Sequence, residues 1–246
     1  MNLSNKIILV TGGSSGIGES IVYKLVEYSA KVIFTYNSSK DNAKKISNKT
    51  GALALKCNIS NEQECNNVVN KILKKHGRID VLVNNAGIYD GAEIDNPRFL
   101  EVWEKVMKIN LNGSIYFIRA VTPIMKKQKS GRIINISSIH SVEGVAEGMA
   151  YHASKAALDA VTRVAAIELA SYNINVNSIA PGAIKTPIWD DTDEKEKFEI
   201  INRIPLKRFG NSDEIAGPVV FLASDLSNYI TGQTIFVDGG ILINVF

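Results

Sequence analysis

The chain has 246 residues, of which 45% are hydrophobic and 22% are charged, and its formal net charge at pH 7 is +3. This composition is ordinary for a soluble globular protein, and the length suits one large α/β domain. So small a net charge gives no reason to expect nucleic acid or an anionic membrane as a partner. No apolar run reaches the ~18 residues that a bilayer-spanning helix needs, and no cleavable signal precedes the first strand, so we expect a cytoplasmic protein.

Short apolar runs alternate with amphipathic segments along the whole chain. The sequence predicts strands at Ile7–Val10, Lys31–Thr35, Ala52–Cys57, Val81–Asn84, Arg132–Ser137, Asn175–Ile179 and Thr234–Val237. It predicts helices at Gly16–Tyr28, Asp41–Lys49, Glu62–His76, Trp103–Lys127, Tyr151–Leu169 and Ser212–Ala223. Alternating strands and helices indicate an α/β fold: one domain over residues 1–246, built on a doubly wound parallel sheet of the Rossmann-like kind with helices on both faces.

The two cysteines, Cys57 and Cys65, fall in different predicted elements. Their spacing matches neither a disulfide framework nor a metal site. We therefore expect reduced thiols and no bound metal.

The first strand ends in a glycine-rich turn, Thr11-Gly12-Gly13-Ser14-Ser15-Gly16-Ile17-Gly18, which leads into a helix. Glycines let a backbone approach a diphosphate closely, and the N-terminus of a helix offers free N–H groups and a positive dipole end. The glycine spacing differs from the common G-x-G-x-x-G fingerprint. The alternative is that these glycines only turn the chain.

Later strands also end in small polar residues: Asn84-Asn85-Ala86-Gly87, Ser137-Ser138 and Pro181-Gly182. Open parallel sheets bind ligands at the carboxyl ends of their strands. The sequence therefore predicts a ligand site along this one edge.

A tyrosine and a lysine stand four residues apart, at Tyr151 and Lys155, on a predicted helix. Residues at this spacing share a helix face. A phenol has a pKa near ~10, and a neighbouring ammonium lowers it. We expect the pair to exchange a proton with a substrate oxygen near neutral pH.

Taken together, the motifs resemble those of the short-chain dehydrogenase/reductase family. T-G-x-x-x-G-x-G, N-N-A-G, a serine before Y-x-x-x-K, P-G and D-G-G occur in this order from Thr11 to Gly240. The resemblance implies NAD(P)(H)-dependent interconversion of a carbonyl and a secondary alcohol by hydride transfer. It implies a catalytic set of Asn110, Ser138, Tyr151 and Lys155. It implies cofactor contacts from Gly12, Ser14, Ser15, Gly16, Ile17, Gly18, Tyr36, Asn37, Ser38, Asn58, Ile59, Asn85, Ala86, Gly87, Tyr151, Lys155, Pro181, Gly182, Ile184 and Thr186.

By this resemblance Tyr151 exchanges the proton, Ser138 holds the substrate oxygen, Lys155 tunes Tyr151 and bonds the nicotinamide ribose, and Asn110 holds a water. A non-catalytic redox sensor on the same fold is the alternative of another class. Such descendants usually lose part of the catalytic set, which is complete here.

The residues after the second strand, Tyr36-Asn37-Ser38-Ser39-Lys40, include no carboxylate that would chelate a ribose diol and select NAD(H). Hydroxyls, an amide and a lysine suit a 2′-phosphate, which favours NADP(H). Asn58 stands where the family usually has an aspartate beside the adenine, and its side-chain oxygen can still accept a hydrogen bond.

The resemblance implies a small carbonyl or alcohol compound as substrate, and two branches of the family compete. One reduces 3-oxoacyl thioesters on an acyl carrier protein, an acidic partner that Lys126, Lys127 and Lys129 could meet. The other oxidises sugars or polyols, as glucose dehydrogenases do, and His140 suits its pocket. The charged segment 184–208 is predicted to be a mobile substrate lid.

The resemblance also implies a homotetramer, or a homodimer. The C-terminal tail, Ile241 to Phe246, is apolar. A second subunit would bury it, although it could instead fold onto its own core.

Overall fold

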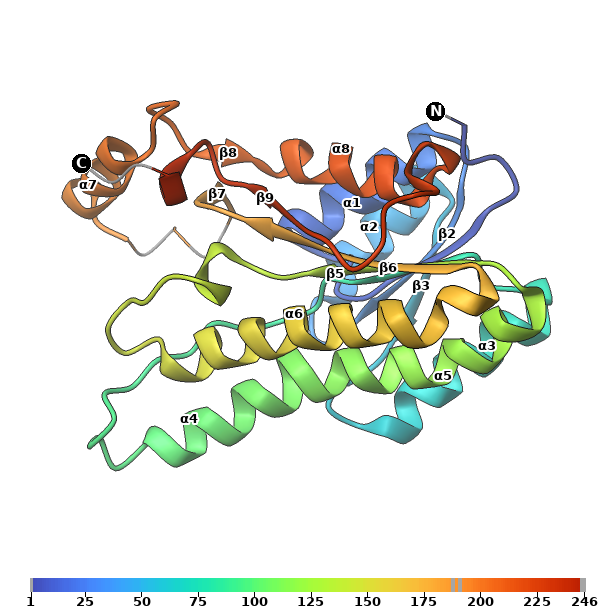
Figure 1. Ribbon diagram of the computed structural model, residues 1–246, viewed down its shortest axis with the longest axis horizontal. Coiled ribbons are helices and arrows are strands. Elements are labelled where there is room, and N and C mark those ends of the chain that lie inside the picture. Colours follow the sequence, from blue (N-terminus) through green and yellow to red (C-terminus); the bar gives the residue numbers. More distant parts are fainter. Residues whose placement is uncertain (1, 187–188, 190–191, 244–246) are drawn as a thin grey trace.

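The computed structural model describes residues 2–186, 189 and 192–243. Among these residues, seven parallel strands form one sheet in the order β3-β2-β1-β4-β5-β6-β9 (Figure 1). Their bounds are β1 Ile7–Val10, β2 Lys31–Tyr36, β3 Leu53–Lys56, β4 Val81–Asn84, β5 Gly131–Ile136, β6 Ile174–Pro181 and β9 Thr234–Val237. The order reverses between β1 and β4, and open α/β sheets bind ligands at the carboxyl ends of the strands at such a point. The predicted doubly wound α/β fold is confirmed.

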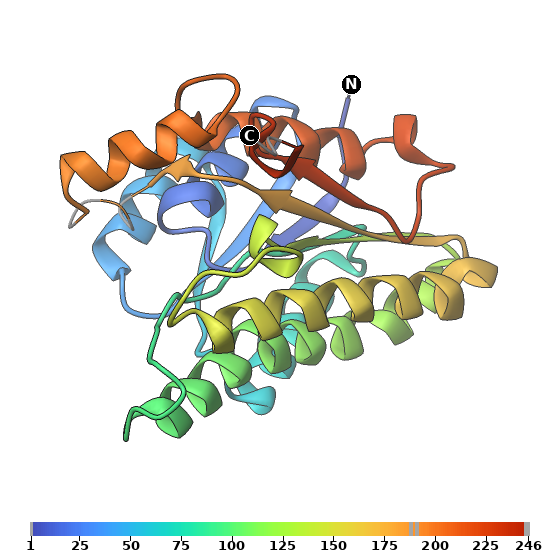
Figure 2. The same cartoon turned by 60° about the vertical axis from the view of Figure 1, so that its left-hand side comes forward.

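Helices cover both faces of the sheet (Figures 1 and 2). One face carries α1 Gly16–Glu27, α2 Lys40–Thr50 and α8 Ser212–Ala223, and the other carries α3 Glu62–His76, α4 Phe99–Val106, α5 Gly113–Gln128 and α6 Met149–Leu169. Strand β1 contributes side chains to the cores on both faces of the sheet. In β1, Ile8 and Val10 join the core beneath α1 and α8, whereas Ile7 and Leu9 join the core beneath α3 and α5. Burial on both faces explains the continuous apolar runs of the sequence.

The predicted helix at 103–127 is interrupted. α4 begins earlier, at Phe99, and a π-helical segment, Met107–Asn112, joins it to α5. π-Helical turns often occur at functional sites, and this one holds Asn110, which is buried.

The segment 184–208, predicted as a lid, contains regular structure that the sequence analysis missed. Strand β7, Ile184–Lys185, pairs with β8, Gly210–Asn211, and helix α7 spans Glu194–Arg203. No side chain of α7 is fully buried, and the helix lies beyond the carboxyl ends of the strands (Figure 2). Residues 187–188 and 190–191 of the predicted lid lie outside the described residues.

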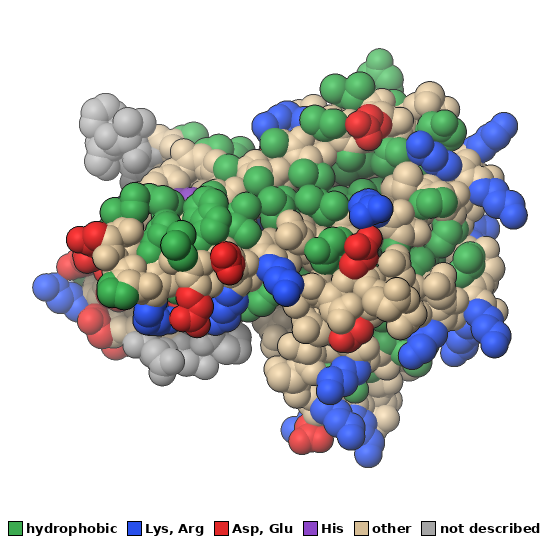
Figure 3. Space-filling model, turned by 90° about the horizontal axis from the view of Figure 1, so that it is seen from below, with side chains coloured by type: hydrophobic (Ala, Val, Ile, Leu, Met, Phe, Trp, Pro, Cys, Tyr) green, Lys and Arg blue, Asp and Glu red, His purple; other side chains and the backbone are tan. Residues whose placement is uncertain are grey.

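Hydrophobic side chains also remain on the surface. Figure 3 views the face formed by α4, α5 and α6 and shows them gathered across it. Leu100, Val164 and Ile167 are each more than half exposed there. Of the tail, Ile241 is buried and Ile243 is exposed, whereas residues 244–246 lie outside the described part. Among the residues described, no helix has both the length and the apolar character that crossing a membrane requires.

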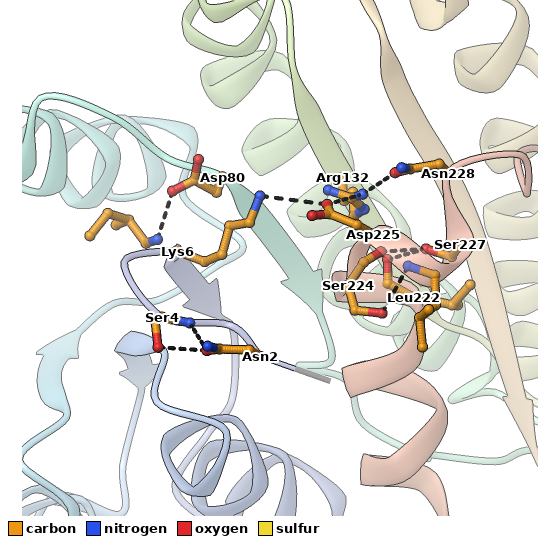
Figure 4. A network of polar contacts seen from close by, with 12 residues as sticks. Asn2, Ser4, Lys6, Asp80, Arg132, Leu222, Ser224, Asp225, Ser227 and Asn228 are labelled. Carbon is orange, nitrogen blue, oxygen red and sulfur yellow. Dashed lines mark hydrogen bonds and ion pairs between the residues drawn. The ribbon is translucent and has the colours of Figure 1, made fainter.

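A polar network closes the amino end of the sheet (Figure 4). The nearly buried guanidinium of Arg132 on β5 donates to Asp225, 3.0 Å away, and to Asn228 in the turn after α8. Asp80, just before β4, accepts a 2.7 Å hydrogen bond from the backbone N–H of Ile7. These contacts join β1, β4 and β5 to the end of α8. The candidate site lies at the other end of these strands, where their carboxyl ends are.

Candidate active site

The glycine-rich turn and the N-N-A-G segment hold one another at the carboxyl ends of β1 and β4. The hydroxyl of Thr11 accepts hydrogen bonds of 3.0 Å from the backbone N–H groups of Asn85 and Ala86. The side chain of Asn85 donates to the carbonyl oxygens of Thr11 and Gly12. A Cβ at Gly18 would collide with the backbone oxygen of Gly12 and with the side-chain amide of Asn85. The two segments can lie this close only because glycine stands here.

This arrangement fits the diphosphate of a nicotinamide dinucleotide. Ser15, the N-cap residue of α1, makes no side-chain cap hydrogen bond, so the N–H groups of the first turn are left for an anion. Gly12 and Gly16 have φ of +65° and +52°, a backbone conformation that glycine favours. A Cβ at Gly16 would meet the side chain of Thr186 at 3.5 Å, so the segment after β7 lies against the same turn.

The end of β2, where the predicted adenosine-binding residues begin, is bonded to the glycine-rich turn through Thr35, and two further details were not expected. Asn42, which no motif indicated, donates from its amide to the carbonyl oxygen of Ser14 and ties α2 to this turn. The side-chain oxygen of Asn58 already accepts two hydrogen bonds from Ser60, at 3.1 and 2.8 Å. An adenine amino group would have to share that oxygen. Tyr36 is half-buried at the end of β2, and the side chains that follow it are exposed.

The four predicted catalytic residues come from three parts of the chain, and two of them, Asn110 and Lys155, meet beside Gly87. A Cβ at Gly87 would lie 3.2 Å from the side-chain oxygen of Asn110 and 3.7 Å from the ammonium of Lys155. Tyr151 and Lys155 share one face of α6, as predicted, with the Lys155 Nζ 5.6 Å from the Tyr151 ring centroid. Ser138 follows β5, and its hydroxyl lies near enough to the Tyr151 phenol to lower the pKa of that phenol.

The electrostatics of the pair differ from the expectation that Lys155 lowers the pKa of Tyr151. Burial raises the pKa of Tyr151, and the nearby Ser138 hydroxyl only partly opposes this effect. Burial lowers the pKa of Lys155 to about 8, against the smaller opposing influence of Asp159, one turn further along α6. The Lys155 ammonium instead donates a 2.8 Å hydrogen bond to the carbonyl oxygen of Ile136.

Asn110 uses its side-chain amide to hold the chain after N-N-A-G. Its Oδ1 accepts from the backbone N–H of Ile88 at 2.8 Å, and its Nδ2 donates to the Ile88 carbonyl at 2.9 Å. The Nδ2 also lies 3.3 Å from the hydroxyl of Ser154 on α6. The π-helical segment therefore links the end of β4 to α6.

Aromatic rings flank the Tyr151 phenol. The rings of Tyr89 and His140 both meet it edge-on, with centroids 5.2 and 5.9 Å away. Burial, followed by the charges of His152 and Arg203, lowers the pKa of His140 to about 4, so its imidazole is neutral at physiological pH. The expectation that His140 borders the pocket agrees with this position, whereas Tyr89 carried no sequence signal.

The lysines considered for a carrier protein lie elsewhere in the subunit. Lys126 and Lys127 stand in the last turn of α5, and Lys129 follows it, just before β5 begins. Ser138 follows the other end of β5. Lys126 lies over the ring of Tyr172, 4.5 Å from its centroid. Within one subunit these cations are therefore at the edge of the sheet opposite to the site.

Comparisons with known proteins agree with this geometry. A family model described as "Enoyl-(Acyl carrier protein) reductase" matches residues 12–242. The 3-oxoacyl-[acyl-carrier-protein] reductase FabG of Thermotoga maritima is 40% identical over 99% of this chain and 100% of its own. The 3-oxoacyl-[acyl-carrier-protein] reductase of Synechocystis is 40% identical over 98% of each chain. The crystal structure of a putative short-chain alcohol dehydrogenase from Sinorhizobium meliloti superposes with a TM-score of 0.91, at 36% identity over 99% of each chain.

Proposed function

Because the chain belongs to the short-chain dehydrogenase/reductase family, and is thus an NAD(P)-dependent oxidoreductase of carbonyl and CH–OH groups, we propose that it reduces 3-oxoacyl thioesters. The observation that carries this proposal is the 40% identity, across essentially the whole chain, to reductases named for that substrate. The proposed catalytic set is Asn110, Ser138, Tyr151 and Lys155.

The dinucleotide, when bound, supplies the hydride, and the protein positions and polarises the substrate. Ser138 and Tyr151 lie together at the end of β5, and both hydroxyls can donate to one carbonyl oxygen. Tyr151, kept protonated by burial, is the proton donor as negative charge develops on that oxygen. Ser138 holds the oxygen against the phenol, and its own hydroxyl oxygen accepts a 3.2 Å hydrogen bond from the backbone N–H of His140.

Lys155 acts on the phenolate that Tyr151 becomes after it gives up its proton. The ammonium is buried among few other charges, so its attraction for the phenolate is strong. The carbonyl of Ile136 orients it. Asn110 keeps the chain after β4 in place beside Lys155, and we retain for it the role of holding a water that returns the proton.

We propose NADP(H) as the preferred cofactor and NAD(H) as the alternative. The turn after β2 presents hydroxyls and the exposed Lys40, which starts α2, with no carboxylate before it. The remaining cofactor contacts are proposed as predicted, from the glycine-rich turn to Thr186. We further propose that residues 1–246 form one catalytic domain, with 184–208 as its substrate lid.

The exposed apolar face of α4, α5 and α6 supports a homotetramer or homodimer (Figure 3). In such an assembly the lysines at the end of α5 could stand nearer to a neighbouring site than to their own. An acidic acyl carrier protein remains the proposed bearer of the substrate, and the cytoplasm the proposed location.

One observation favours a second candidate, a sugar or polyol dehydrogenase. The neutral imidazole of His140 lies edge-on to Tyr151, where it could bond a substrate hydroxyl. The decisive experiment follows nicotinamide absorbance with acetoacetyl and longer 3-oxoacyl thioesters, and with glucose and polyols, using both cofactors. We expect thioesters with NADPH to give the highest kcat/KM. Turnover of sugars alone would replace the proposal with the second candidate, and no turnover of either class would overturn both.

A further inference from the structure

The turn that follows Ser138 carries ionisable side chains that the proposed chemistry does not use. Glu143 places one carboxylate oxygen 2.9 Å from Nδ1 of His140. Its other carboxylate oxygen lies 3.7 Å from the guanidinium of Arg203, the last residue of α7. One largely buried carboxylate therefore stands between an imidazole at the active site and a helix of the 184–208 segment.

The His140 ring packs against a second imidazole, that of His152, as well as against Tyr151. The His140 and His152 ring centroids are 4.6 Å apart. His152 accepts a 3.1 Å hydrogen bond at Nε2 from the backbone N–H of Val145, so its Nδ1 carries the proton that it shares with the Gly148 carbonyl, 2.6 Å away. These two hydrogen bonds fix the tautomer and the orientation of the His152 ring, against which His140 packs.

The two nitrogens of His140 have different surroundings. Nδ1 is fully buried and makes no aligned hydrogen bond with any described residue, although the Glu143 carboxylate is close enough for one. The side chain as a whole is 27% exposed, and no described residue bonds its Nε2. A carboxylate beside Nδ1 favours the proton there, which leaves Nε2 as a hydrogen-bond acceptor.

The same turn is attached to the 184–208 segment by apolar contacts. Ile139 packs with Ile204, directly after α7, and with Ile241 near the C-terminus. The turn after Ser138 therefore contacts the end of α7 twice. Ile139 packs in this apolar cluster, and Glu143 pairs with Arg203.

We propose that Glu143 is a positioning residue that holds His140 edge-on to Tyr151, with Arg203 holding Glu143 in turn. His140 is thereby a specificity-determining residue, whose Nε2 accepts a hydrogen bond from a substrate hydroxyl or amide N–H. This inference rests on the proposed function, because it takes Tyr151 as the group at which the substrate reacts.

The first test needs no turnover. The chain has only three histidines, so the imidazole nitrogen resonances of histidine-labelled protein can be assigned with single His→Asn variants. We expect an Nδ1-protonated His140 whose signals move in Glu143→Gln and stay unchanged in Glu147→Gln, a matched change at an exposed residue of the same loop. If the His140 signals do not change in Glu143→Gln, Glu143 does not position His140. This result does not depend on knowing the substrate.

The second test is a double-mutant cycle on kcat/KM with the best substrate of the panel. Coupled neighbours typically interact strongly, so we expect Glu143→Gln to lower kcat/KM about ten-fold in the wild-type background and less than about two-fold in the His140→Ala background. The KM for the cofactor and the thermal midpoint should change little. Equal losses in both backgrounds would show that Glu143 acts independently of His140.

Arg203 is 61% exposed, and solvent screens such pairs. We therefore expect Arg203→Met to lower kcat/KM only about two- to three-fold, and Arg203→Lys to restore most of the loss. Comparing thioesters that carry an amide N–H with alkyl thioesters that lack it, and polyols with their deoxy analogues, identifies the donor. The effect of Glu143→Gln should vanish with the analogue that lacks it, and an equal effect on both members of each pair would overturn the specificity role.

Discussion

The ammonium of Lys155 donates its 2.8 Å hydrogen bond to the carbonyl oxygen of Ile136, the last residue of β5. A helix side chain is thereby tied to the strand end from which Ser138 follows. Burial lowers the pKa of Lys155 to about 8. The charge that acts on the Tyr151 phenolate is therefore lost within an experimentally accessible pH range.

The first prediction concerns this titration. We expect kcat/KM for carbonyl reduction to fall above about pH 8, as Lys155 loses its proton. Asp159 raises the pKa of Lys155, so Asp159→Asn should move this alkaline limb to lower pH. Glu168→Gln, an exposed change on the same helix, should leave the limb in place. A profile that is identical in Asp159→Asn and the wild type would contradict the assignment.

The lowered pKa of Lys155 also determines how the free energy of unfolding changes with pH. The folded pKa of about 8 lies below the 10.5 of an ordinary lysine. Between these values the unfolded chain binds more protons, so this group makes the free energy of unfolding rise with pH in that window. The cost of burying the charge is fully present below about pH 8.

The second prediction concerns the proton donor. Tyr151→Phe keeps the ring that packs against Tyr89 and His140 but removes the hydroxyl. General acid–base catalysis contributes about 10²–10⁴-fold, so we expect kcat to fall by that factor while cofactor affinity changes little. The control is Tyr89→Phe, which keeps the neighbouring ring and should retain most activity. Turnover of purified, folded Tyr151→Phe within a few-fold of wild type would falsify the role.

The sheet could be predicted because its signals are local. Strand β1 is apolar at every position, since Ile8 and Val10 face one helix layer while Ile7 and Leu9 face the other. The π-helical segment at 107–112 could not be predicted, because one extra residue in a turn leaves the apolar spacing almost unchanged. Helix α7 was missed since it is strongly charged and buries no side chain fully.

In the candidate site, too, some residues could be predicted from local sequence and others could not. The motifs indicated Ser138 and Lys155 because their types and spacing carry the chemistry. Asn42 and Glu143 were missed because their roles depend on tertiary contacts with Ser14 and His140. The expected lowering of the Tyr151 pKa was wrong, because proximity along a helix says nothing about burial, and burial here raises this pKa.

The third prediction tests the glycine-rich turn. Gly18→Ala puts a Cβ against the backbone oxygen of Gly12, which cannot move aside without disturbing β1. We expect it to cost about 1–3 kcal/mol of unfolding free energy and to weaken dinucleotide binding. Gly217→Ala on α8 is the matched control, because its Cβ would meet no atom within 4 Å, and alanine should gain up to about 1 kcal/mol in a helix. Denaturant unfolding and cofactor titration measure both variants, and equal behaviour would refute the proposed close packing.

The fourth prediction concerns cofactor choice, which depends on the turn between β2 and α2. Tyr36 ends β2, and Lys40 begins α2, whose Asn42 is bonded to the glycine-rich turn. We therefore expect the 2′-position of a bound adenosine ribose to lie near this turn. Tyr36→Asp introduces a carboxylate that would repel a 2′-phosphate and accept hydrogen bonds from a free ribose diol.

A charge-assisted hydrogen bond contributes about 1.5–3 kcal/mol, so Tyr36→Asp should move the ratio of kcat/KM for NADPH and NADH toward NADH by about ten-fold or more. Lys40→Ala should weaken NADPH and leave NADH almost unchanged. Lys49→Ala, at the other end of α2, is the control for a simple loss of positive charge. A wild type that already prefers NADH strongly, or a ratio that Tyr36→Asp leaves unmoved, would mean that the cofactor is selected by residues outside this turn.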